Sequence, residues 1–376
     1  MLTSLRMKGY RGFRDYGVEG LAHVNLLVGR NNCGKTSILE AVHLLASGAD
    51  PEVLAQIAER RGEVVAASSS HEGYRSDGPP TPTCVHFFHG HEFGPDSEFR
   101  IHGSDHREEA VVQVKTIADL DQQQQQLFAD YDKDLLQPPL VMVTTGRHDG
   151  SLTEPLAVTL TDEGALSQRP TVRYGRLRRA RTEPLPPVEF ISPDSLMPRS
   201  MSAMWNSVLT DGKESDVIAA MRILEPAIEN IFFLSGATPY RFGGRSGILV
   251  AFRGTKRREP LGSHGDGMRR LLAIALALSQ ARGGILLIDE IDTGLHYSVM
   301  GDMWRLVVET AQQSDVQVFA TTHSLDCVRG LAWLCDNYPA LAKEVSVQKI
   351  EPTLEESVTL DAGELMVAVD QEIEVR

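Results

Sequence analysis

The sequence predicts an α/β fold built on a mixed, largely parallel central sheet. Two apolar runs, Val24 to Val28 and Ile285 to Ile288, are typical of strands that are buried on both faces. A third strand, Val316 to Ala320, ends in polar residues. From residue 256 to Leu334 helical and strand patterns alternate along the chain, as a parallel α/β core requires.

The order of these patterns divides one predicted domain, residues 1–376, into five segments. The first contains two strands, a Gly-rich loop and a helix, the second is an inserted antiparallel β-rich region, and the third is a helical lobe. The fourth completes the core, and the fifth is a C-terminal tail. Their bounds are 1–48, 49–194, 195–245, 246–345 and 346–376. Because no heptad pattern is sustained, we expect no long coiled coil.

The inserted region and the helical lobe carry weaker patterns. Residues 51–61 have helical character, and residues 216–233 have helical spacing that Pro226 would kink. Alternating apolar and polar residues predict strands at 84–88, 98–102, 110–114, 140–145, 156–160 and 188–191.

Composition and charge restrict the class of protein. The chain has 376 residues, of which 42% are hydrophobic and 23% charged, an ordinary globular balance. It contains no apolar stretch long enough to span a bilayer and no signal peptide pattern, so we expect a cytoplasmic protein that does not enter membranes. A net charge of −14 argues against a generally basic DNA-coating protein.

The Gly-rich loop carries the most specific motif in the chain. Its residues fit the pattern G-x-x-x-x-G-K-[ST] between a predicted strand and a predicted helix, the context in which this loop binds nucleotide phosphates. The loop consists of Gly29, Arg30, Asn31, Asn32, Cys33, Gly34, Lys35 and Thr36, and Ser37 follows on the helix. We expect this segment to bind ATP, with Lys35 at the β- and γ-phosphates and Thr36 on Mg²⁺.

Polar residues follow two of the predicted parallel strands. Asp289 and Glu290 come directly after Ile288, at the edge of a parallel sheet where ligands bind. We expect Asp289 to hold Mg²⁺ and Glu290 to act as the general base toward water, although acids here would also cap the next helix. His323 follows the strand at 316–320 and is a candidate for the γ-phosphate or the attacking water, whereas a lone histidine at a strand end is more often structural.

A second helix N-terminus that could bind a phosphate group is predicted at residues 261–268. Ser263, Gly265 and Gly267 precede the apolar helix from Arg269 to Ser279. Helix N-termini of this composition bind anions. Two such sites in one chain suggest that the second completes the pocket of a partner subunit.

The order of these motifs resembles the ABC-type ATPases, and within them the branch that includes RecF, SMC and the OLD (overcoming lysogenization defect) proteins. The resemblance covers the first 45 residues and residues 245–335, and Leu295-His296 and Asn31-Asn32 favour this branch over the transporters. It implies a homodimer that encloses two ATP molecules. In that dimer Lys35 and Glu290 act from one subunit and Ser263 from the other.

The resemblance is incomplete in three respects. The signature reads Ser-His-Gly-Asp-Gly in place of Ser-Gly-Gly, and no glutamine loop is evident, since the run at 122–126 is a poor match. OLD proteins usually carry a C-terminal Toprim nuclease, and about fifty residues after His323 are too few for one. We therefore expect the effector to be a separate nuclease-like protein, and anti-phage defence or DNA maintenance to be the setting.

Other readings stay open at this point. An ATP-dependent scaffold with little hydrolysis would not need Glu290, a transporter subunit would not need the inserted sheet, and a small-molecule kinase would not need Ser263. Double-stranded DNA is a further candidate partner. The arginine run at 173–181 would contact nucleic acid or form a solvated loop, and the histidines at 86–106 are typical of a surface loop more than of a metal site.

Overall fold

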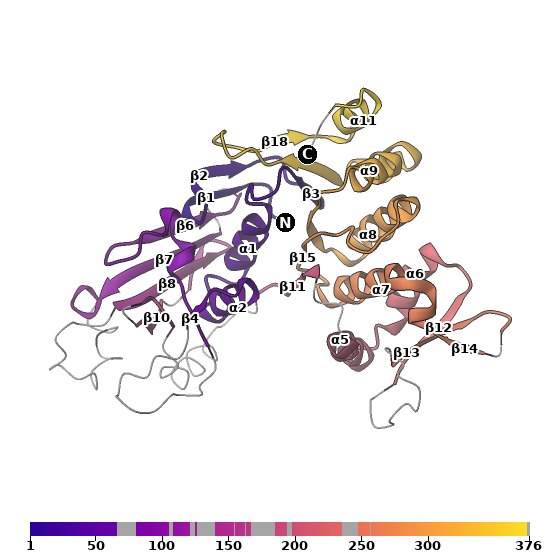
Figure 1. Cartoon of the computed structure of the whole chain (residues 1–376), viewed down its shortest axis with the longest axis horizontal. Helices are drawn as coiled ribbons and strands as arrows, with labels where there is room; N and C mark the ends of the chain where they lie inside the picture. The colour runs from indigo at the N-terminus through magenta and orange to yellow at the C-terminus, as the bar shows by residue number, and fades with distance from the viewer. Residues whose placement is uncertain are drawn as a thin grey trace.

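The computed structural model describes two large β-sheets with helices between and beside them (Figure 1). The described residues are 1–65, 80–104, 108–120, 125, 140–153, 155–161, 163–166, 185–193, 198–234, 247–255 and 257–373. The glutamine run at 122–126 therefore lies outside them except for Gln125, and so does the arginine run at 173–181.

One sheet is antiparallel and joins the N-terminal hairpin to the predicted insertion. Its strand order is β10-β8-β7-β6-β1-β2, with β9 paired to β8. The strands are β1 (Leu5–Tyr10), β2 (Phe13–Val18), β6 (Glu98–His102), β7 (Glu109–Thr116), β8 (Leu140–His148), β9 (Ser151–Leu152) and β10 (Leu156–Thr159). The strands predicted at 98–102, 110–114, 140–145 and 156–160 are confirmed, the last to within one residue.

The other sheet is mixed and forms the centre of the molecule. Its order is β11-β15-β16-β3-β17-β18, with parallel pairing from β11 to β17 and antiparallel pairing of β18. The strands are β11 (Val188–Ile191), β15 (Ile285–Ile288), β16 (Gln317–Thr321), β3 (Val24–Val28), β17 (Val345–Lys349) and β18 (Val358–Leu360). The predicted mixed central sheet is confirmed, and β11 joins it beside β15.

Helices cover both faces of the central sheet. Helix α1 (Lys35–Ala46) lies between the two sheets and contacts β15 and β16 on one side and β6 and β7 on the other. Helices α7 (Gly265–Gln280), α8 (Met300–Ser314) and α9 (Leu325–Asn337) lie on the opposite face (Figure 1). Helix α2 (Pro51–Arg61), which was predicted, packs on α1, and α11 (Ala362–Asp370) packs on α9.

This two-sided cover explains the unbroken apolar runs. Leu27, Leu287 and Phe319 belong to the core that faces α1, whereas their neighbours Leu26 and Leu286 belong to the core that faces α7 to α9. All five are essentially inaccessible to water. Burial of each such side chain contributes about 1.5–3 kcal/mol, which favours apolar residues on both faces of these strands.

Two predicted elements are wrong in type. The predicted helix at 216–233 is α6 (Glu214–Leu224) followed by strand β12 (Ile228–Phe233). Pro226 ends the helix rather than kinking it, because a proline forces the preceding residue, Glu225, into extended backbone. The predicted strand at 84–88 is instead a 3₁₀ turn, η1 (Val85–Phe87), in which Cys84, Phe87 and Phe88 are buried.

The predicted helical lobe is thus a mixed unit. Helices α5 (Pro198–Thr210) and α6 lie beside a three-stranded sheet of β12, β13 (Ile248–Phe252) and β14 (Arg258–Pro260). The remaining short elements are β4 (Val64–Val65), β5 (Thr81–Pro82), α10 (Pro339–Ala342) and the 3₁₀ turns η2 (His89–His91), η4 (Ile117–Asp119), η7 (Leu261–His264) and η8 (Tyr297–Val299). Within the described ranges, none of the helices combines the length and the apolar character that crossing a bilayer requires.

Candidate active site

The predicted phosphate loop connects the carboxyl end of β3 to the first turn of α1. Gly34 has a φ of 99°, and a Cβ on it would lie 2.4 Å from Cζ of Phe13. Gly29 has a φ of 146°, and a Cβ there would lie 2.7 Å from the carbonyl oxygen of Ile350. Left-handed backbone and close neighbours both favour glycine, so the loop holds its shape through these two residues.

The start of α1 is open to an anion. Gly34 offers no side-chain cap, and the first turn contains no acidic residue. The N–H groups at a helix start have no partners within the helix and carry a partial positive charge. Next to them the loop tip, Arg30 to Asn32, is exposed. This arrangement suits a phosphate group.

Lys35 is buried with its ammonium group held by the loop. Its Nζ donates to the carbonyl oxygens of Gly29 at 2.8 Å and Arg30 at 2.9 Å, and Nδ1 of His323 lies 3.2 Å away. Burial lowers the pKa of Lys35, and the nearby thiol of Cys33 opposes that shift. The structure therefore brings together two predicted site residues from β3–α1 and from the loop after β16.

Asp289 meets Thr36 across the central sheet. The Thr36 hydroxyl lies 3.1 Å from both carboxylate oxygens of Asp289. Strand β16 lies between β15 and β3, and its last residue, Thr321, donates to Oδ1 of Asp289 at 2.6 Å. A hydroxyl and a carboxylate at this distance form a set of hard oxygen donors, the kind that Mg²⁺ prefers.

Glu290 follows on a turn with unusual backbone. Its φ is 50°, in the left-handed region that few side chains adopt, and its N–H donates to the hydroxyl of Thr321 at 2.9 Å. Its carboxylate accepts from the hydroxyl of Thr293 at 3.1 Å. Strained backbone of this kind persists where the surroundings fix it, which is common at functional sites.

Arg270 binds the backbone of the same turn. This arginine of α7 is fully buried, and its guanidinium donates to the carbonyl oxygens of Asp289 at 3.0 Å, Glu290 at 2.9 Å and Ser192 at 3.2 Å. Burial lowers the pKa of Arg270. The sequence analysis missed Arg270, Thr293 and Thr321. An arginine within an otherwise apolar helix face was the signal available for the first.

Ser37 lies on the far side of Thr36 and is buried. Its hydroxyl accepts from Arg61 of α2 at 3.2 Å, and Arg61 also contacts Glu40 at 2.7 Å. Arg11, from the turn between β1 and β2, contacts the other oxygen of Glu40 at 2.9 Å. Helix α1 is thus tied through ion pairs of the buried Glu40 to both α2 and the antiparallel sheet.

The predicted signature lies away from the phosphate loop in this chain. Ser263 is exposed in η7, which packs against β13 and β14, and Figure 1 shows α7 between these strands and α1. Gly265 starts α7 with a φ of 88° and with open space where a Cβ would lie. A Cβ on Gly267 would approach Leu295 at 3.3 Å, which connects this helix start to the loop after Glu290.

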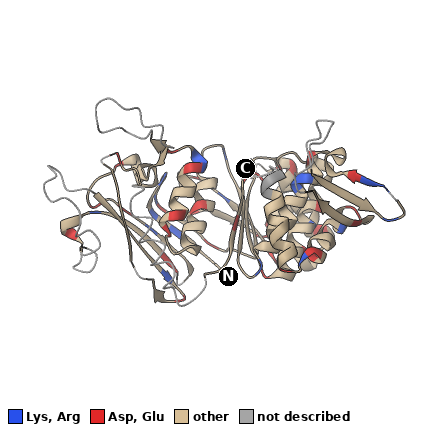
Figure 2. Ribbon diagram, turned by 90° about the horizontal axis from the view of Figure 1, so that it is seen from below, with Lys and Arg blue, Asp and Glu red and all other residues tan. Residues whose placement is uncertain are grey.

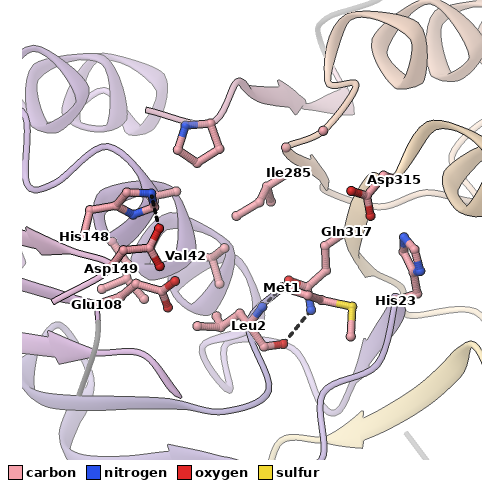
Figure 3. A pocket seen from close by; sticks show the side chains of 15 residues that line it. Met1, Leu2, His23, Val42, Glu108, His148, Asp149, Ile285, Asp315 and Gln317 are labelled. Atoms are coloured by element: carbon pink, nitrogen blue, oxygen red, sulfur yellow. Dashed lines mark hydrogen bonds and ion pairs between the residues drawn. The ribbon is translucent and has the colours of Figure 1, made fainter. Parts of the chain in front are cut away.

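A separate pocket lies at the opposite edge of the sheet. Its volume is about 250 Å³, and it includes the residues that begin β15 and β16, Ile285 and Gln317 (Figure 3). Gln317 holds the N-terminal residue Leu2 by two hydrogen bonds, and Glu108 and His148 line the other side. None of the predicted site residues lines this pocket, and they gather instead at the carboxyl edge of the sheet.

The histidine-rich segment does not assemble a metal site in the described part of the chain. The rings of His86 and His91 approach at 3.2 Å and His89 contacts the carbonyl of Arg11, while His106 lies outside the described residues. Among described residues no group of three or more His, Cys, Asp and Glu is arranged to hold a metal ion. A Mg²⁺ site needs fewer protein ligands, because substrate phosphates and water supply the rest.

Two family models match the chain at the two halves of this site. The model described as "AAA ATPase domain" matches residues 1–83, and the model described as "AAA domain, putative AbiEii toxin, Type IV TA system" matches residues 170–326. The first includes the phosphate loop, and the second includes Ser263, Asp289 and Glu290. The chain is a P-loop ATPase.

Individual relatives of this ATPase are distant or locally similar. A Helicobacter pylori protein named "ATP/GTP phosphatase" is 20% identical in an alignment 357 residues long that covers 87% of this chain and 86% of that protein. The RecF protein of Acinetobacter baumannii, a "DNA replication and repair protein", is 47% identical over 47 residues, or 12% of this chain and 13% of RecF.

Solved structures with a similar outline include two SMC heads. An SmcHead bound to the C-winged helix domain of ScpA has 12% identity and a TM-score of 0.46, with 97% of this chain and 99% of that chain covered. The SMC head domain of Thermotoga maritima has 13% identity and a TM-score of 0.41, with 96% and 98% covered.

Proposed function

We propose that this ATPase binds Mg²⁺–ATP at the carboxyl edge of the central sheet and hydrolyses it there with Glu290 as the general base. The observation that carries the proposal is the meeting of Thr36 and Asp289 at 3.1 Å, with Thr321 bridging them to the backbone of Glu290. Thr321 ends β16, Asp289 and Glu290 directly follow β15, and Thr36 lies in the first turn of α1 after β3. The groups therefore surround a helix start that suits phosphate.

The metal donors fit the ion that the reaction needs. The Thr36 hydroxyl and the Asp289 carboxylate would hold Mg²⁺, which neutralises charge that develops on the phosphates. Lys35 would exchange its two carbonyl contacts in the loop for phosphate oxygens, and His323 beside it would face the γ-phosphate. Glu290 would orient and deprotonate the attacking water, since its carboxylate is fixed by Thr293 and its backbone by Arg270.

Completion of the site by a second copy is the next step of the proposal. The helix start at Ser263, Gly265 and Gly267, where the first two residues are exposed, lies away from the phosphate loop of its own chain. A homodimer would bring it to the ATP of the other subunit. ATP binding and hydrolysis would then close and open the dimer. That switch would act on a separate effector, such as a nuclease or a toxin, or on double-stranded DNA, in anti-phage defence or DNA maintenance.

The net charge of the chain favours the protein effector over DNA. Net charge is −14, and Figure 2 shows lysine and arginine scattered over both halves of the described ribbon together with acidic residues. Duplex binding normally relies on a gathered basic surface.

The decisive experiment measures Mg²⁺-dependent ATP turnover together with mass in solution. Lys35→Ala should abolish turnover, and Glu290→Gln should slow it at least a hundredfold while an ATP-bound dimer accumulates. Equal turnover in wild type and Glu290→Gln would refute the catalytic assignment and favour an ATP-dependent scaffold. Turnover without a dimer would refute the shared site. Stimulation of turnover by double-stranded DNA would indicate that DNA, and not a protein effector, is the target of the switch.

A further inference from the structure

The C-terminal part of the chain forms an apolar groove inside an acidic surface. The groove lies between β18 and α11 and has a volume of about 700 Å³. It is lined by Val358, Leu360, Val367, Ala368 and Ile373, among others. Three of these are well exposed for aliphatic side chains: Val358 at 44%, Val367 at 59% and Ile373 at 54%. Figure 1 shows both elements at one edge of the molecule, distant from α1.

Helix α11 is fixed at both ends, so its outward face is a formed surface. Asp361 and Glu364 make a capping box at the start, in which each side chain accepts from the other's backbone N–H. At the end, Ile373 N–H donates to the carbonyl of Ala368, and Glu372 has a φ of 53°. That is a Schellman ending, which turns Ile373 back toward the groove.

The inner face of the same helix is already used by the core. Leu365 and Ala368 are buried against α9 and β17, and Met366 and Val369 pack partly against the same core. Val367 points elsewhere and has no such cover. The exposed side chains of Val358, Val367 and Ile373 therefore add an apolar surface beyond the one that holds α11 in place, and Ala368 borders both.

The charge around the groove is negative on balance. Lys349 lines the groove together with the carboxylates of Asp361 and Glu364. Two further carboxylates, Asp370 and Glu372, lie at the end of α11 and just after it. A neutral apolar occupant would leave them uncompensated, whereas a cationic one would gain from them, especially at low salt.

We propose that this groove docks a basic amphipathic helix of a partner protein, with apolar side chains on Val358, Val367 and Ile373 and lysine or arginine facing the acidic rim. An amphipathic helix laid into an apolar groove is a recurring recognition mode. The proposal concerns a surface outside the nucleotide site and holds whether or not the chain dimerises.

The test uses the full chain and a fluorescein-labelled 18-residue peptide of leucine and lysine with helical spacing. A peptide of the same composition in scrambled order is the control, and affinity is measured by fluorescence anisotropy. We expect the patterned peptide to bind at least tenfold more tightly than the scrambled one, and binding to weaken severalfold between 50 and 300 mM salt.

Variants locate the binding to the groove. Val367→Ser with Ile373→Ser should weaken the patterned peptide at least tenfold, and Asp370→Asn should weaken it about threefold. Leu209→Ser is the matched control, since Leu209 is an aliphatic residue of α5 with 48% exposure. All replaced apolar residues are exposed, so the variants should fold, which circular dichroism checks. Equal binding of both peptides, or equal effects of the groove and control variants, would overturn the proposal.

Discussion

Replacing Arg270 by methionine tests whether the turn after β15 depends on a buried cation. The three carbonyl oxygens of Ser192, Asp289 and Glu290 each accept from this guanidinium at 2.9–3.2 Å. Hydrogen bonds to a charged group contribute about 1.5–3 kcal/mol each, or roughly 5–9 kcal/mol for three. Desolvation of the buried cation offsets several kcal/mol of this.

The net loss should be about 3–5 kcal/mol, because methionine fills the volume but leaves three buried carbonyls without their donor. The midpoint of thermal unfolding should fall by about 4–6 °C, since the unfolding entropy grows with chain length. Turnover should fall at least tenfold, since the strained backbone of Glu290 loses its support, whereas ATP affinity should change less than threefold because the phosphate loop is untouched. Urea unfolding, thermal unfolding and ATP turnover measure the three effects.

A nearby arginine provides the control. Arg282, just beyond the end of the same helix, pairs with Asp216 at 3.3 Å with both side chains about half exposed. Arg282→Ala should therefore cost at most about 1 kcal/mol. Arg270→Lys should recover part of the stability, because one ammonium cannot reach three carbonyls. A loss below 1 kcal/mol with turnover within twofold of wild type would refute the supporting role of Arg270.

Three further predictions rest on other contacts. Gly34→Ala should reduce ATP affinity at least tenfold, since its methyl group would overlap an aromatic ring, whereas Gly12→Ala, where nothing lies within 4 Å, should not; equal affinities would contradict this. Thr321→Val should lower kcat about tenfold with little change in KM, because the backbone of Glu290 loses its acceptor, and an unchanged kcat would count against it. Burial lowers the pKa of His43 from 6.5 to about 4, with Arg60 adding to the shift. As the pH falls, His43 therefore takes up its proton in the unfolded chain before it does so in the folded chain. The free energy of unfolding should fall by about 2 kcal/mol from pH 7 to pH 5. His43→Leu should remove that part of the slope in urea unfolding, and an unaltered slope would exclude His43 as its source.

The phosphate loop and the central strands of this ATPase could be predicted from the sequence, because they depend on local backbone conformation and on burial. The glycines of the phosphate loop are dictated by backbone conformation, and the runs at Val24 and Ile285 by burial on both faces. Asp289 and Thr36 could be expected to meet because the carboxyl ends of parallel strands share one edge. Their meeting at 3.1 Å follows that expectation.

Contacts between distant segments decided the rest. Pairing with β13 makes 228–233 a strand although its spacing is also helical, and Thr321 becomes important because its strand lies between β3 and β15. Arg270 donates a hydrogen bond to the backbone of Glu290, which lies 20 residues later in the sequence. The helical periodicity around Arg270 does not predict this partner. A sequence pattern records which residues avoid water and where the backbone must turn. Which buried groups then become partners depends on strand order and helix packing, which exist only once the chain has folded.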